Sequence, residues 1–245
     1  MAFGPDNRNS MRIGTLNRDQ AHAAGIDAGL RAHMLKVYNY MASGLALTGI
    51  VAMFTAQSES MMQIIFGGGA LTWIIMLSPL AFVMVLSFGV NKMQASTLQA
   101  VFWAFSAVMG LSMASIFVVY TGASIARVFF ITAGTFAGMS LYGYTTKRDL
   151  SGFGSFLMMG LIGIIIASIV NMFMQSTAMH FVISVIGVLV FVGLTAYDTQ
   201  KIKSLYLESD GAEVASKKAI MGAVSLYLDF VNLFMMLLHL FGNRR

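Results

Sequence analysis

Residues 150–197 have the sequence LSGFGSFLMMGLIGIIIASIVNMFMQSTAMHFVISVIGVLVFVGLTAY, without a single Asp, Glu, Lys or Arg. The hydrocarbon core of a bilayer, about 30 Å thick, is crossed by about 20 apolar residues in an α-helix. The run is long enough for two crossings, and its polar segment 171–177, NMFMQST, divides it. Its apolar residues do not alternate as a transmembrane β-strand requires. The run therefore predicts two successive membrane-spanning helices.

The rest of the chain repeats this pattern. Charge-free runs cover residues 37–58, 60–91, 93–126 and 128–146, and another apolar segment follows at 217–241. Only 10% of all residues are charged, against about 25% in soluble domains. We therefore predict an all-α integral membrane protein, in which a polar cytoplasmic leader (1–30) precedes a seven-helix transmembrane domain (31–245). The spans are expected at about 34–56, 64–90, 96–120, 124–145, 152–174, 178–203 and 217–241.

The basic residues predict an orientation, because Lys and Arg concentrate in cytoplasmic loops. If the N-terminus is cytoplasmic, all but three of the 15 Lys and Arg residues fall on the cytoplasmic side. Seven spans then place the C-terminus in the periplasm; one re-entrant span would return it to the cytoplasm. Orientation thus accounts for the net charge of +5, and no nucleic-acid partner is expected. The three exceptions are Arg127, Arg244 and Arg245.

The absence of cysteine excludes a disulfide framework, a Cys metal site and a thiol nucleophile. We expect no cofactor. Small residues are instead expected to let helices pack closely within the chain, or in a dimer. These are the pairs Gly134 and Gly138, and Gly110 and Ala114.

Two carboxylates lie within predicted spans, Asp198 in the sixth and Asp229 in the seventh. A charge at membrane depth costs roughly 2.5–3.5 kcal/mol on insertion scales and usually marks function. Spans six and seven form a hairpin, so the two aspartates can face each other. Helical spacing puts Ser225 and Asn232 on the face of Asp229, and Thr195 on that of Asp198. The alternative is structural: either aspartate caps a helix or pairs with a loop lysine, as Asp198 can with Lys201.

Five segments carry a resemblance to a known family. They are 29–41 (GLRAHMLKVYNYM), 78–81 (SPLA), 135–150 (TFAGMSLYGYTTKRDL), 196–202 (AYDTQKI) and 225–234 (SLYLDFVNLF). In these segments the chain, from residue 27 on, resembles the transmembrane Bax inhibitor motif family, in its bacterial Bax inhibitor-1/YccA-like branch. The resemblance implies a bacterial inner-membrane protein whose last helix is central to the bundle.

The resemblance also implies a pH-sensitive calcium leak, gated by an aspartate pair that maps onto Asp198 and Asp229. Two nearby carboxylates in a low-dielectric site cannot both ionise cheaply, so they titrate as a unit. When ionised, they become transient ligands for a hard cation such as calcium. Some members pair this dyad with an arginine in the second helix. Residues 60–91 contain no basic residue, so that contact cannot be carried over.

Two other functions stay open. Relatives of the YccA type act on a membrane-bound ATP-dependent protease, so the chain is alternatively a non-transporting regulator that contacts such a protease through residues 1–30. Two intramembrane aspartates also resemble presenilin-type proteases. Those enzymes carry Gly-x-Gly-Asp and a Pro-Ala-Leu segment, whereas this chain has Leu226-Tyr-Leu-Asp229 and prolines only at Pro5 and Pro79. We therefore expect no enzyme activity.

Overall fold

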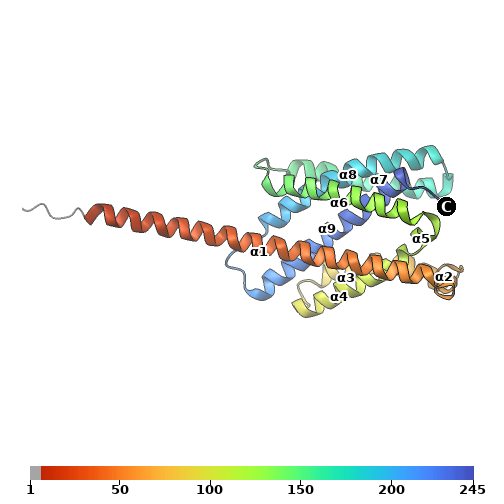
Figure 1. The fold of residues 1–245 in the computed structure, drawn as a ribbon, viewed down its shortest axis with the longest axis horizontal. Helices are drawn as coiled ribbons and strands as arrows, with labels where there is room; N and C mark the ends of the chain where they lie inside the picture. The colour runs from red at the N-terminus through yellow and green to blue at the C-terminus, as the bar shows by residue number, and fades with distance from the viewer. Residues whose placement is uncertain (1–6) are drawn as a thin grey trace, which may run out of the picture.

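The computed structural model describes residues 7–245, with side chains described from residue 28 on. Seven of its helices are long and apolar enough to cross a membrane, which confirms the predicted fold class. Figure 1 shows their arrangement as a bundle from which α1 projects. The helices are α1 (Asn7–Gln57), α2 (Glu59–Phe66), α3 (Ala70–Gly89), α4 (Ala95–Met113), α5 (Ser115–Val119), α6 (Gly122–Thr145), α7 (Ser151–Met174), α8 (Thr177–Ser204) and α9 (Ala212–Phe241).

Two helix starts differ from the sequence prediction. The second span begins at Ala70, not near residue 64, because Gly67–Gly69 separate it from the short helix α2. Gly68 has φ +79°, a left-handed conformation that favours glycine and ends a helix. Helix α1 begins at Asn7, well before the first predicted span, which is expected to begin near residue 34. The side chains of the leader lie outside the described residues.

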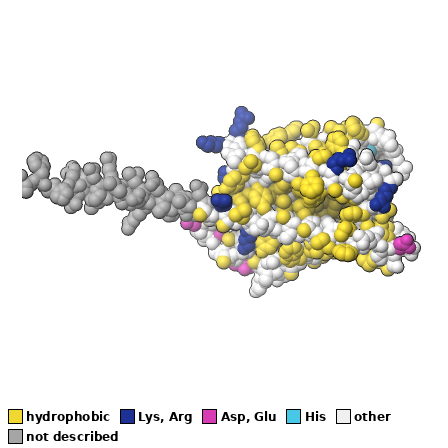
Figure 2. Space-filling model, in the orientation of Figure 1, with side chains coloured by type: hydrophobic (Ala, Val, Ile, Leu, Met, Phe, Trp, Pro, Cys, Tyr) yellow, Lys and Arg dark blue, Asp and Glu magenta, His cyan; other side chains and the backbone are white. Residues whose placement is uncertain are grey.

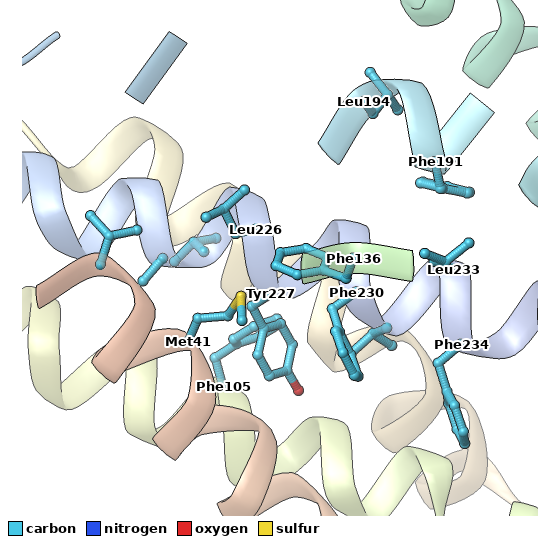
Figure 3. Close-up of a cluster of buried hydrophobic side chains, with 14 of the residues drawn as sticks. Met41, Phe105, Phe136, Phe191, Leu194, Leu226, Tyr227, Phe230, Leu233 and Phe234 are labelled. Atoms are coloured by element: carbon cyan, nitrogen blue, oxygen red, sulfur yellow. The ribbon is translucent and has the colours of Figure 1, made fainter. Parts of the chain in front are cut away.

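Helix α9 occupies the centre of the bundle, as expected. It packs against α8, α1, α6 and α4. Of the 18 residues that form its most hydrophobic stretch, 67% are buried, the largest share for any span. Figure 3 shows large side chains of α9 meeting those of the surrounding helices. Leu226, Tyr227 and Leu233 are completely enclosed. The neighbouring helices account for this burial, since the more hydrophobic spans α3 and α7 are much less buried.

The residues after α9 are tied to the corner between α5 and α6. The backbone N–H of Thr121 donates to the carbonyl of Asn243 (3.1 Å), and that of Arg245 donates to the carbonyl of Val119 (2.9 Å). The N–H of Asn243 also donates to the Ser124 hydroxyl, at 2.9 Å. These contacts fix the far end of α9 in place.

The two small-residue pairs behave differently. A Cβ atom at Gly110 would lie 2.6 Å from the carbonyl oxygen of Thr48, and Ala114 is fully buried. This pair therefore packs inside the bundle, as predicted. Gly134 and Gly138 are exposed and have nothing within 4 Å of such an atom. The expectation that they pack within the chain is wrong, because they lie on the outer face of α6.

Candidate functional site

Asp229 lies deep in the bundle on α9. Its side chain is only 5% exposed, and its enclosed Oδ2 atom makes no hydrogen bond. A buried polar atom without a partner is rare in folded proteins and calls for a functional or structural explanation. The enclosure of Asp229 is consistent with the position of α9, which packs against α1, α4, α6 and α8.

Asp198 lies one helix away, at the wall of a cavity of about 470 Å³. The cavity opens at the end of the bundle where α8 ends and α9 begins. His33 of α1 and Asn91, just after α3, complete its polar wall. Ser225 of α9 lines the same cavity. Asp198 is half-buried, so this aspartate is the member of the pair that can be reached from outside.

The two carboxylates lie close enough to interact electrostatically. Helices α8 and α9 form an antiparallel hairpin and pack along their length. The structure therefore brings together the two aspartates that the sequence singled out. Their environments differ: Asp229 is enclosed, whereas Asp198 faces the cavity.

Lysines dominate the mouth of this cavity, but two of the three are paired. The Nζ atom of Lys218 lies 2.6 Å from Asp210, and that of Lys217 lies 3.7 Å from Glu213. Lys201 acts electrostatically on Asp198, yet no ion pair within 4 Å joins them in the described part of the chain. The structure therefore shows no ion pair that would support the alternative hypothesis, in which Asp198 serves only to pair with Lys201.

The predicted supporting residues divide into two groups. Ser225 lines the cavity beside Asp198. Thr195 is fully buried and donates its hydroxyl to the carbonyl of Phe191, at 2.8 Å. The amide of Asn232 donates to the carbonyl of Leu228, at 2.9 Å. Thr195 and Asn232 therefore bond to their own helices, and no hydrogen bond joins either of them to an aspartate in the described residues.

Sequence reasoning missed a chain of hydroxyl groups that crosses three helices. The hydroxyls of Tyr38 (α1) and Ser140 (α6) lie 2.5 Å apart, and that of Ser140 lies 2.9 Å from Thr199 (α8). Thr199 directly follows Asp198. One available signal was the recurrence of Ser124, Thr132 and Ser140 every eight residues, on the buried face of α6.

The pair does not have the ligands of a resident metal centre. Within residues 28–245, no group of three or more His, Asp or Glu side chains is placed to hold a metal ion. Calcium takes six to eight oxygen ligands, and two carboxylates supply four at most. The two aspartates therefore supply fewer oxygen ligands than a calcium ion takes.

Comparison with known proteins extends this picture. The family model for the inhibitor of apoptosis-promoting Bax1 matches residues 30–245. The inner membrane protein YbhL of Escherichia coli (strain K12) is 50% identical over 220 residues, 89% of this chain and 94% of YbhL. An uncharacterized protein of Rickettsia prowazekii is 50% identical over 219 residues, 89% of this chain and 92% of the relative. An uncharacterized membrane protein of Streptococcus pyogenes is 36% identical over 219 residues, 89% of this chain and 95% of the relative.

Proposed function

We propose, on the premise that this chain belongs to the Bax inhibitor family and is a multi-pass inner membrane protein, that it is a pH-sensitive calcium leak. The gate is the pair Asp198 and Asp229. The observation that carries the proposal is the enclosed Oδ2 of Asp229, without a hydrogen-bond partner, beside a second carboxylate that faces a cavity.

The switch follows from the charge of the pair. When one proton is shared, the carboxylates can hydrogen-bond to each other and hold α8 against α9. When both carboxylates are ionised, they repel each other in a low-dielectric site, where the repulsion is far stronger than in water. A divalent cation then becomes a favourable partner for their oxygens. The same site supplies both the response to pH and the preference for a cation.

In our proposal the described conformation is the closed one, and side-chain packing keeps it closed. Beyond Asp229, towards the end of α9, the centre of the bundle is filled by Phe230, Leu233, Phe234 and Leu237. Conduction therefore requires α9 to move relative to α8, which repulsion between the aspartates would favour.

The cavity is compatible with cation entry despite its lysines. Asp210 and Glu213 offset the charges of Lys218 and Lys217. Lys201 remains, and its Nζ lies 5.9 Å from the centroid of the Tyr197 ring. In our proposal Lys201 acts on Asp198 in place of the second-helix arginine that this chain lacks.

The orientation is part of the proposal. The end of the bundle that carries the cavity also carries Lys92, Lys147, Arg148 and Lys203 in its loops and helix ends. The positive-inside rule places this end in the cytoplasm. Cytoplasmic protons then have direct access to Asp198.

Calcium flux into liposomes containing the purified full-length chain tests the proposal. With the lumen and bath titrated together from pH 5 to 8, flux should change steeply with pH, and Asp229→Asn should flatten the profile. Asp149→Asn is the matched control. Asp149 lies in the exposed loop between α6 and α7, where hydrogen bonds from Ser151 lower its pKa, so it stays ionised throughout this range. Absence of protein-dependent flux at every pH would refute the leak.

A second candidate, regulation of a membrane-bound protease, is favoured by the length of α1. This helix has 51 residues, about 75 Å at 1.5 Å per residue, against a hydrocarbon core of about 30 Å. Figure 1 shows α1 extending well beyond the other helices, and its length exceeds the thickness of the hydrocarbon core. Removal of residues 1–27 from the chain would separate the two functions: a regulator loses its partner, whereas a leak keeps its flux.

A further inference from the structure

A groove runs between α1 and α6 on the outer face of the bundle. Helix α1 packs against α4 and α9, and α6 packs against α8 and α9, so the two helices flank α9 and leave a hollow between them. Two adjoining hollows, of about 550 and 710 Å³, share Met41 and Phe230 in their walls. Figure 2 shows this face, with hydrophobic side chains along the length of the groove.

The hollow nearer the cavity end has a wall that is suited to a hydrocarbon chain. Met34, Phe136 and Phe230 contribute its apolar surface, and the rings of Phe136 and Phe230 meet edge to face, with centroids 5.6 Å apart. Two of its hydroxyls, those of Tyr38 and Ser140, bond to each other. Apart from Arg31 and Tyr144, the wall therefore offers mainly carbon contacts to a guest.

The length of this hollow matches one leaflet. Along α1 it extends from Arg31 to Met41, about 15 Å at 1.5 Å per residue. The hydrocarbon core is about 30 Å thick, so each leaflet contributes half of that depth. The hollow therefore has about the length of one acyl chain of a lipid in that leaflet.

The open end of the hollow is cationic. Arg31 lines it, and within residues 28–245 no ion pair joins Arg31 to a carboxylate. A second cation lies close by: Nζ of Lys203 donates to the carbonyl of Tyr144, at 2.7 Å, and Tyr144 also lines the hollow. Arginine is well matched to phosphate, because its planar guanidinium donates two parallel hydrogen bonds.

We infer that the α1–α6 groove binds a phospholipid with an anionic head group, its acyl chain lying on Phe136 and Phe230 and its phosphate held by Arg31. An anionic lipid fits better than a zwitterionic one, because two cations lie at the mouth and attraction of a basic residue to an anionic head group is favourable at the surface. The inference is independent of calcium conduction, since neither aspartate lines the groove.

Photo-crosslinking tests this site in the purified full-length chain. The probes are a phosphatidylglycerol and a phosphatidylcholine that carry the same photoreactive acyl chain. Phosphatidylglycerol adducts should concentrate on residues 31–41 and 133–144. Arg31→Gln should reduce them by roughly fivefold, the effect of about one basic residue at the membrane surface. Arg148→Gln is the control, because it removes the same charge at the same end of the bundle without touching the groove.

A second pair of variants tests the hydrocarbon wall. Ala137→Trp fills the hollow and should also reduce the adducts, whereas Ala104→Trp, an exposed alanine of α4 outside the groove, should not. If Ala137→Trp fails to fold, the surface substitution Arg31→Gln still tests whether the groove binds the lipid. Equal labelling by the two lipids, labels spread over all outward faces, or an unchanged yield in Arg31→Gln would each overturn the inference.

Discussion

The hydroxyls of Thr48 on α1 and Tyr227 on α9 lie 2.6 Å apart in the interior of the bundle. The Thr48 hydroxyl also lies within bonding distance of the carbonyls of Ser106 (2.8 Å) and Gly44 (3.0 Å). Thr48 has one proton to donate, and these carbonyls can only accept. Tyr227 is therefore the donor to Thr48, and this bond connects the first span to the last.

The direction of this bond predicts an asymmetry between two substitutions. Tyr227→Phe loses one hydrogen bond, worth about 1 kcal/mol. Thr48→Val leaves the fully buried Tyr227 hydroxyl without an acceptor, which costs about 1–3 kcal/mol. Thermal unfolding of the purified variants in detergent should show the larger loss for Thr48→Val. The double variant should lose less stability than the sum of the two single losses, because no buried hydroxyl is then left without a hydrogen-bond partner. Additive losses would show that the hydroxyls do not interact.

Two glycines of α6 provide a second prediction. A Cβ atom at Gly143 would collide with the backbone of Ala196 in α8. Gly143→Ala must therefore push α6 away from α8, and overpacking of this kind typically costs about 1–3 kcal/mol. Gly138→Ala is the matched control in the same helix, with open space around it, and alanine favours helix by up to about 1 kcal/mol. A lower Tm is expected only for Gly143→Ala; equal Tm values would contradict the close contact.

The aspartate pair should respond as a unit. We expect Asp198→Asn and Asp229→Asn each to flatten the pH dependence of calcium flux, with the larger effect at Asp229, which is more deeply enclosed. The double variant should add little to either single change, because the shared proton is lost in each. Asp229→Ala should differ from Asp229→Asn, since Asn keeps a hydrogen-bond partner for Asp198. If the effects on flux are strictly additive, or if Asp198→Asn leaves the pH profile intact, the pair is not the gate.

The topology predicts on which side of the membrane each loop lies. Reporter fusions should alternate between cytoplasm and periplasm along the chain, with three cytoplasmic positions that fall at the cavity end of the bundle. Two successive fusions on the same side would contradict seven crossings. The fusion points are Ser58, Lys92, Gly122, Arg148, Ser176 and Gly211, of which Lys92, Arg148 and Gly211 should be cytoplasmic.

The aspartates should not hydrolyse peptide bonds. The flanking residues of Asp229 lack the Gly-x-Gly-Asp pattern of intramembrane aspartyl proteases. The purified chain, incubated with a transmembrane substrate peptide, should therefore yield no fragments. Cleavage that disappears in Asp229→Ala would reverse this conclusion.

The sequence predicts the spans well because the physical constraint is strong. Charged residues are excluded from hydrocarbon, so the charge-free runs mark the helices directly. The same constraint identified Asp198 and Asp229 as exceptions. The central position of α9 came from the family resemblance, since span hydrophobicity alone does not rank the helices by burial.

Contacts between helices were less predictable. Gly110 and Gly134 occur in the same small-residue pattern, yet only Gly110 faces another helix. The spacing of residues defines a face of a helix but does not tell whether protein or lipid covers it. The hydroxyl chain of Tyr38, Ser140 and Thr199 was missed for a related reason. Each of three helices contributes one member, so the chain exists only after the helices are assembled.

The central position of α9 has a consequence for biosynthesis. The ribosome makes this helix after all the other spans, because synthesis proceeds from the N-terminus. Until α9 is inserted, the preceding helices have no common partner, and the inward faces of α1, α4, α6 and α8 remain unpacked. Before that point the nascent chain can form the α1–α4 and α6–α8 contacts, but the faces that α9 covers are still exposed. The hydrogen bonds of Asn243 and Arg245 with the α5–α6 corner can form only after α9 has crossed the bilayer, so they complete the bundle.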